Sequence, residues 1–118
     1  MNHPVTLKAK IALACQLTAP DQVRRMNELH QTLFKKVTQL VEHATSYDLV
    51  FQKPDRGLYA ELMEFIQFER LCCPWLKFQL VFEPGDGPVF LRLGNSPETR
   101  EMVKLVMKLE QLAQQGTR

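Results

Sequence analysis

The 118-residue sequence lacks most of the features that identify a protein class directly. No apolar run approaches the roughly 20 residues needed to span a bilayer, so we predict no membrane partner. Fifteen basic residues nearly balance 13 acidic ones, and the basic residues are scattered among the acids, which excludes the basic patch of a nucleic-acid-binding protein. Three cysteines, an odd number, argue against a disulfide framework and favour a reducing compartment.

The start of the chain also lacks a convincing signal sequence. Residues 8–16, "KAKIALACQ", place basic residues before an apolar stretch and a cysteine, as in a lipoprotein signal. The apolar part is only "IALA", shorter than the roughly 7–15 residues that such a signal requires. We therefore expect a cytoplasmic protein. Its content of 45% hydrophobic and 24% charged residues is ordinary for a globular protein, and residues 1–118 are expected to form one domain.

Hydrophobic periodicity and turn signals predict four strands and three helices. The expected strands are residues 5–17, 46–52, 76–83 and 89–93; the expected helices run from an N-cap at Thr18 to about Ala44, from about Leu58 to Cys72, and onward from Ser96. In the last helix the expected inner face consists of Met102, Leu105, Val106, Leu109 and Leu112. The loop "PGDGP" joins the last two strands into a hairpin, and it is interpreted as turn chemistry and not as a phosphate-binding loop.

The order β-α-β-α-β-β-α predicts an α+β fold. We expect a two-layer sandwich in which a four-stranded, mostly antiparallel sheet carries the helices mainly on one face. The pairing of the first two strands with the hairpin does not follow from the pattern. If the other sheet face is uncovered, Val81 and Phe90 are exposed on it, and a homodimer becomes possible.

Glu69 is the one residue whose place in its helix is not explained by simple packing. At 100° per residue, one arc of the second helix contains Leu58, Leu62, Phe65, Ile66, Cys72 and Cys73, and Glu69 falls at the middle of that arc. A carboxylate at such a position has to be paired, neutralised or placed at a cleft. It could brace the helix by binding backbone amides, a lysine or an arginine, or it could serve the thiols one turn away.

The three cysteines all map to apolar faces and could share a ligand. Cys72 and Cys73 end the second helix before Pro74, and Cys15 lies on the apolar face of the first expected strand. Three thiolates with Glu69 would suit a thiophilic ion such as Zn(II), Cu(I), Hg(II) or As(III). Simple packing is the alternative, because cysteine is commonly buried and because the C-terminal end of a helix disfavours a thiolate.

No histidine is close to these cysteines in sequence. His3, His30 and His43 are expected to be solvated or to have packing roles, the last two on the first helix. Trp75 is expected to anchor the following strand against the core.

The segments "ACQLTAPDQVRR" and "FERLCCPWLKFQLVFEPGDGPVFLRLGN" resemble a family of small bacterial proteins for which no activity is established. Its hallmark is an E-R-x-C-C-P-F-L-x-F motif with an upstream C-x-L-T segment, and some members are encoded near heavy-metal resistance genes. This sequence has Trp75 where the family usually has phenylalanine. Matched position by position, the resemblance singles out Cys15, Glu69, Arg70, Cys72, Cys73 and Pro74.

Three functional hypotheses remain open at this stage. In the first, Cys72 and Cys73 bind a soft metal or metalloid, Cys15 supplies a third ligand, and Glu69 is a ligand or orients one. In the second, one thiolate is a nucleophile or redox centre with Glu69 as its proton acceptor. In the third, the protein is a structural or interaction module whose cysteines only fill the core.

Overall fold

The computed structural model describes residues 19–107, which form three helices and one four-stranded sheet. The helices are α2 (Pro20–Phe34), α3 (Arg56–Cys72) and α4 (Pro97–Val106), and the strands are β1 (Gln39–Glu42), β2 (Tyr47–Phe51), β3 (Phe78–Phe82) and β4 (Val89–Leu93). Every pair of neighbouring strands is antiparallel, in the order β1-β2-β4-β3. The predicted α+β class with a four-stranded antiparallel sheet is confirmed.

One predicted helix is wrong in its second half. The helix expected to reach Ala44 ends at Phe34, and residues 39–42 form strand β1. Thr38 begins the pairing, because both its amide and its hydroxyl donate hydrogen bonds to the carbonyl of Val50, at 2.7 and 3.0 Å. Sheet pairing with β2 therefore outweighs the helical spacing of the apolar residues in this segment.

Other predicted elements agree with the structure to within a few residues. The helix α3 begins at Arg56, because the Asp55 carboxylate accepts a hydrogen bond from the Leu58 amide at 2.7 Å, and it ends at Cys72 before Pro74. The N-cap of α2 is Ala19 and not Thr18. Ser96 caps α4 as predicted, but the predicted inner face of this helix was wrong at one position: Leu105, expected to face inward, is 49% exposed, and Val103 is fully buried instead. The strand expected at residues 5–17, with Cys15, and the continuation of the last helix through Leu109 and Leu112 lie outside the described residues.

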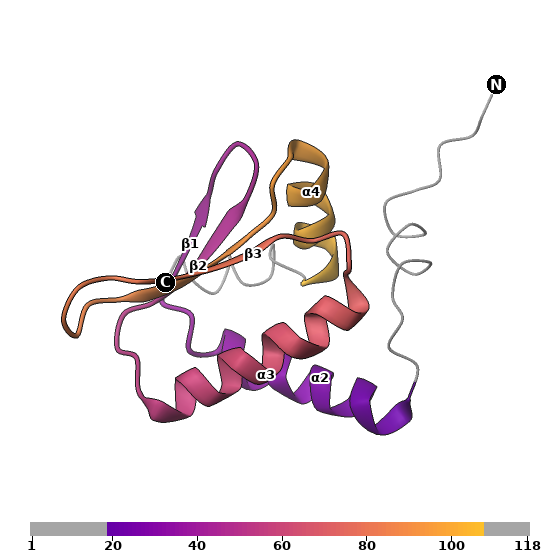
Figure 1. Ribbon diagram of the computed structural model, residues 1–118, viewed down its shortest axis with the longest axis horizontal. Helices are drawn as coiled ribbons and strands as arrows, with labels where there is room; N and C mark the ends of the chain where they lie inside the picture. The colour runs from indigo at the N-terminus through magenta and orange to yellow at the C-terminus, as the bar shows by residue number, and fades with distance from the viewer. Residues whose placement is uncertain (1–18, 108–118) are drawn as a thin grey trace.

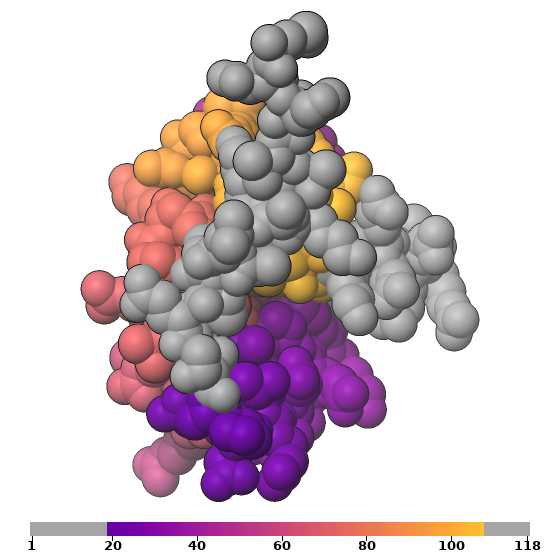
Figure 2. All heavy atoms as spheres, turned by 90° about the vertical axis from the view of Figure 1, so that its right-hand side faces the viewer, coloured from indigo at the N-terminus to yellow at the C-terminus, as the bar shows by residue number. Residues whose placement is uncertain are grey.

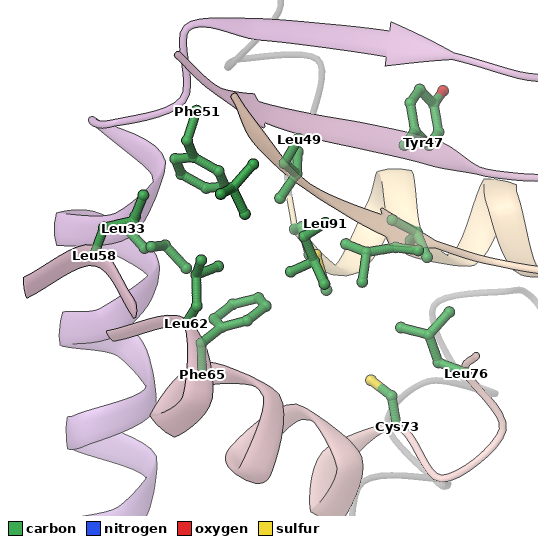
Figure 3. Close-up of a cluster of buried hydrophobic side chains, with 14 of the residues drawn as sticks. Leu33, Tyr47, Leu49, Phe51, Leu58, Leu62, Phe65, Cys73, Leu76 and Leu91 are labelled. Carbon is green, nitrogen blue, oxygen red and sulfur yellow. The ribbon is translucent and has the colours of Figure 1, made fainter. Parts of the chain in front are cut away.

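The hydrophobic core lies between one face of the sheet and the helices. Alternate residues of β2 and β4 face it in register: Tyr47 opposite Leu93, Leu49 opposite Leu91, and Phe51 opposite Val89. The helices contribute Leu33, Leu58, Leu62, Phe65, Cys72 and Val103, and Met107 follows the end of α4. Figure 1 shows α2 and α3 side by side below the sheet, and Figure 3 shows their side chains meeting those of the sheet. That the helices lie mainly on one face stays a prediction.

The opposite face of the sheet, which the sequence left either covered or open, is largely buried along β2. All five residues of β2 are buried, which includes Asp48 and Val50 on this second face. Val81 and Phe90 are half-buried, and the guanidinium carbon of Arg92 lies 5.5 Å from the centre of the Phe90 ring.

In Figure 2, residues of α2 fill the bottom of the view and those near the end of α4 lie above them. No helix in residues 19–107 is both long and apolar enough to span a bilayer.

Candidate functional site

Glu69 is fully buried, as its position in the helix predicted. Its exposed fraction is 0%, and it lies on α3 between Phe65, one turn earlier, and Cys73, one turn later. A carboxylate in such a place requires hydrogen-bond partners, because an unpaired buried charge is very costly. Two partners are present, one on each oxygen.

The first partner of Glu69 is His30, from the neighbouring helix α2. Nε2 of His30 forms a hydrogen bond with Oε1 of Glu69, and the contact is an ion pair when the imidazole is protonated. The imidazole side chain is 19% exposed, so it reaches from the buried carboxylate toward solvent. Its ring also packs against Phe34 and Phe65, with ring centres 5.3 Å apart in both cases, and these two rings contact each other at 5.8 Å. The aromatic contacts and the hydrogen bond together fix the imidazole.

The second partner of Glu69 is the thiol of Cys73. Sγ of Cys73 donates a hydrogen bond to Oε2 of Glu69 over 3.8 Å, and the amide of Cys73 donates to the Glu69 carbonyl at 2.6 Å. The spacing of four residues places both side chains on the same side of the helix end. Figure 3 shows the Cys73 sulfur pointing into the core, next to Leu76. Cys73 is 0% exposed and Cys72 is 6% exposed.

The site thus consists of an imidazole, a carboxylate and a thiol in one hydrogen-bonded series. Within residues 19–107, no three histidine, cysteine or acidic side chains are grouped so that they could hold a metal ion. Of the sequence-predicted residues, the structure brings together Glu69 and Cys73, with Cys72 next to them at the end of α3. Cys15 lies outside the described residues.

His30 is the site residue that sequence reasoning missed. It was expected to have a solvated or packing role, and its packing against Phe34 and Phe65 is only part of what it does. A signal was present in the chain: His30 follows Met26 by four residues and directly follows the fully buried Leu29. It therefore lies at the edge of the inner face of α2, where it can meet α3.

A second buried acid, Asp48, is compensated in a different way. Arg92 donates to both of its oxygens, at 2.8 and 3.0 Å, and Nε2 of His43 lies 2.8 Å from Oδ2. Burial by itself would raise the pKa of the Asp48 carboxyl, but hydrogen bonds from Arg92 and then His43 outweigh it and hold the pKa below its usual value. The sequence had placed His43 on the first helix. That prediction is wrong, because His43 directly follows β1.

Trp75 follows α3 and is half-buried against the core cluster, as predicted for an anchor of the next strand. Its indole Nε1 is buried and has no hydrogen-bond partner among residues 19–107. The loop between β3 and β4 behaves as a turn: Gly85 has a φ of 67°, and the Gly87 amide donates to the Pro84 carbonyl at 3.2 Å.

The resemblance carried by the Cys-Cys-Pro segment stays a prediction. No protein-family model, no curated protein and no solved structure matches the chain.

Proposed function

We propose that the protein binds a soft metal or metalloid ion through the thiolates of Cys72 and Cys73. Cys15 is the third ligand expected from the sequence, and Glu69 accepts the proton that the Cys73 thiol loses. The observation that carries this proposal is the fully buried Glu69 carboxylate, hydrogen-bonded on one oxygen by the Cys73 thiol and on the other by His30.

The contact between Glu69 and Cys73 supports ion binding because a thiol has to lose its proton to become a ligand. A carboxylate 3.8 Å from the sulfur can receive that proton without water entering the core. His30 bonds the other carboxylate oxygen and is partly exposed, so it connects this proton acceptor with the protein surface.

The helix end itself favours a bound cation. Cys72 is the last residue of α3 and Cys73 is its C-cap, so both lie at the negative end of the helix dipole. That end stabilises a cation and disfavours a bare thiolate. The same location therefore supports an ion-binding thiol over the enzymatic hypothesis, which requires a stable and accessible thiolate.

The ligand set needs at least one more donor than Cys72 and Cys73. Soft ions are commonly held by three or four thiolate or imidazole ligands. Cys15 is the remaining cysteine of the chain, and Glu69 is an oxygen donor that already contacts the Cys73 thiol. A complete site on this proposal combines the end of α3 with the N-terminal segment.

A structural role is the second candidate, and burial is the observation that favours it. Cys72 and Cys73 belong to the hydrophobic core cluster and are almost inaccessible to solvent. Free cysteine behaves there as a small apolar residue. On this reading, His30 and Glu69 only brace α2 against α3.

Titration with Zn(II), Hg(II) or As(III) separates the two candidates. The reduced wild-type chain is expected to bind one ion with release of protons, and a variant with Cys15, Cys72 and Cys73 all changed to serine is expected to lose at least 100-fold in affinity. Glu69→Gln should weaken binding by about 10–100-fold, as is typical for a residue that orients or deprotonates a ligand.

His43→Ala is the matched control, because it removes an imidazole from the other buried acid and leaves the cysteines untouched. Circular dichroism verifies that each variant is folded. Equal affinity in the wild-type and triple-serine proteins would exclude ion binding at the thiols and leave the structural role.

A further inference from the structure

The strand β3 has an outer edge that no other described strand covers. It is the last strand in the order β1-β2-β4-β3, and within residues 19–107 it pairs only with β4. The Gly94 amide donates to the Lys77 carbonyl and the Glu83 amide to the Pro88 carbonyl, both at 3.1 Å. The odd-numbered residues of this segment therefore bond to β4.

Backbone alternation then fixes which groups point away from the sheet. In an antiparallel pair, residues that bond to one neighbour alternate with residues whose amide and carbonyl point to the other side. Phe78, Leu80 and Phe82 thus direct their backbone donors and acceptors outward. An uncovered row of this kind is a template for another strand.

The sequence of this edge is complementary to itself. When two copies of "KFQLVFE" lie antiparallel with Leu80 opposite Leu80, Lys77 lies opposite Glu83. Phe78 then lies opposite Phe82, and the outward-pointing residues become the hydrogen-bonded pairs. Opposite charges and paired aromatics across strands are both stabilising.

Neighbouring registers use the same outward backbone groups but lose the charge pairing. Centring on Gln79 places Lys77 opposite Val81, and centring on Val81 places Lys77 opposite Gly85. Centring on Phe82 places Pro84, which has no amide hydrogen, in the new ladder, and centring on Phe78 places Pro74 opposite Phe82. Of these registers, the one centred on Leu80 pairs Lys77 with Glu83 and keeps proline out of the new ladder.

Exposed aromatic side chains lie at the same edge. Phe82 is 57% exposed, and its ring centre is 5.7 Å from that of Tyr59 on α3, which is 39% exposed. In the register centred on Leu80, Phe82 of one copy contacts Phe78 of the other, so the pairing covers apolar surface that a monomer leaves in water.

We propose that two copies of the protein associate edge to edge through β3, forming a continuous eight-stranded antiparallel sheet with its two-fold axis at Leu80. The partner is a second copy of this chain, because antiparallel pairing of the edge with itself places Lys77 opposite Glu83 and Phe78 opposite Phe82. The pairing is independent of the proposed ion site. It also differs from the dimer that the sequence suggested, which used the sheet face carrying Val81 and Phe90.

A charge swap tests the register directly. In analytical ultracentrifugation, the wild-type chain should shift from the mass of its 13.7 kDa monomer toward twice that mass as concentration rises. Lys77→Glu and Glu83→Lys should each raise the dissociation constant at least 10-fold, because each places like charges opposite each other. The double variant, Lys77→Glu with Glu83→Lys, should restore the wild-type constant.

Two further variants serve as controls. Arg24→Glu makes the same change of charge on an exposed part of α2 and should leave the dimer intact. Leu80→Pro removes an outward amide that β4 does not use and should give a folded monomer. A wild-type chain that stays monomeric up to about 1 mM overturns the proposal. Single charge reversals without effect, or a double variant that does not recover, overturn it as well.

Discussion

Glu69 and Asp48 are both buried acids, but their partners have different chemical capacities. Asp48 is bound on both oxygens by Arg92, whose guanidinium keeps its charge at all ordinary pH values. The two hydrogen-bond partners of Glu69 are the His30 imidazole and the Cys73 thiol, each of which can gain or lose a proton. Asp48 also contacts the His43 imidazole, but its Arg92 partner holds a fixed charge, which points to a stabilising role. On the proposed function, Glu69 is the acid that exchanges a proton with its neighbour.

The role of Asp48 predicts how stability depends on pH. Because its folded-state pKa lies below the unfolded value of about 3.9, the ionised carboxylate stabilises the fold fully above that value. That contribution is lost as pH falls through the folded-state pKa. Urea unfolding at a series of pH values from 7 to 2 should therefore show a falling free energy of unfolding at the acid end. Asp48→Asn should be less stable than wild type at pH 7 and should lose less stability on acidification.

Glu64 provides a comparison for that experiment. Its pKa is also held below the usual value, chiefly by the hydrogen bond from Arg25, but its side chain is 37% exposed. Solvent screening weakens such surface pairs. Glu64→Gln should therefore change the loss of unfolding free energy at low pH less than Asp48→Asn does. If Asp48→Asn lost as much unfolding free energy on acidification as the wild type, the stabilising role of the Asp48 carboxylate would be contradicted.

At the scale of elements, local sequence signals predicted the ends of helices and the turns correctly wherever only one signal was present. Pro74 ends α3, Ser96 begins α4, and the glycine-bearing loop turns β3 into β4. Residues 37–42 carried two signals. Their apolar spacing continues that of α2, yet Val37, Thr38 and Val41 are β-branched, and pairing with β2 decided the outcome. The hydrophobic periodicity of one segment carries no information about which strand it will pair with.

The same reason explains what was predictable about the site. The burial of Glu69 follows from its position on one helix, which the sequence determines. Its partner His30 is 39 residues away and is selected by the packing of α2 against α3. Local pattern therefore located the unusual acid, but only the tertiary structure identified the group that compensates it.

The turn after β4 offers a test of how closely two elements approach. Gly94 has a φ of 116°, and a Cβ at this position would lie 2.7 Å from the Thr45 carbonyl oxygen, in the turn between β1 and β2. Gly85 also has a positive φ, 67°, but a Cβ there would meet nothing within 4 Å. Gly94→Ala should lower the free energy of unfolding by about 3 kcal/mol, through strain and overlap together.

Gly85→Ala is the matched control for Gly94→Ala. It carries only the backbone cost of a left-handed alanine, about 1 kcal/mol. Urea denaturation of both variants measures the difference. Equal losses in the two variants would show that the contact between Gly94 and the turn does not constrain the fold.

At the scale of the whole molecule, one core connects the elements that carry the site and the sheet edge. The buried cluster includes Leu33 from α2, Phe65 from α3, Leu49 and Leu91 from the sheet, and Val103 from α4. Since each element buries its apolar face against the others, none has a separate core of its own. The end of α3, with Glu69 and Cys73, and the outer edge of β3 are therefore positioned by the same packing.

A shared core predicts cooperative unfolding. Trp75, the only tryptophan, packs against the cluster, so its fluorescence reports on tertiary structure near α3, while far-ultraviolet circular dichroism reports on all helices. The two urea transitions should coincide.

Leu49→Ala, at a fully buried position in β2, should lower the free energy of unfolding by about 2–5 kcal/mol and shift both midpoints equally. Leu105→Ala, on the exposed side of α4, should shift neither midpoint appreciably. If Leu49→Ala moved the dichroism midpoint and left that of Trp75 in place, the sheet and the end of α3 would be separate folding units, and the proposed ion site would not depend on the core beneath it.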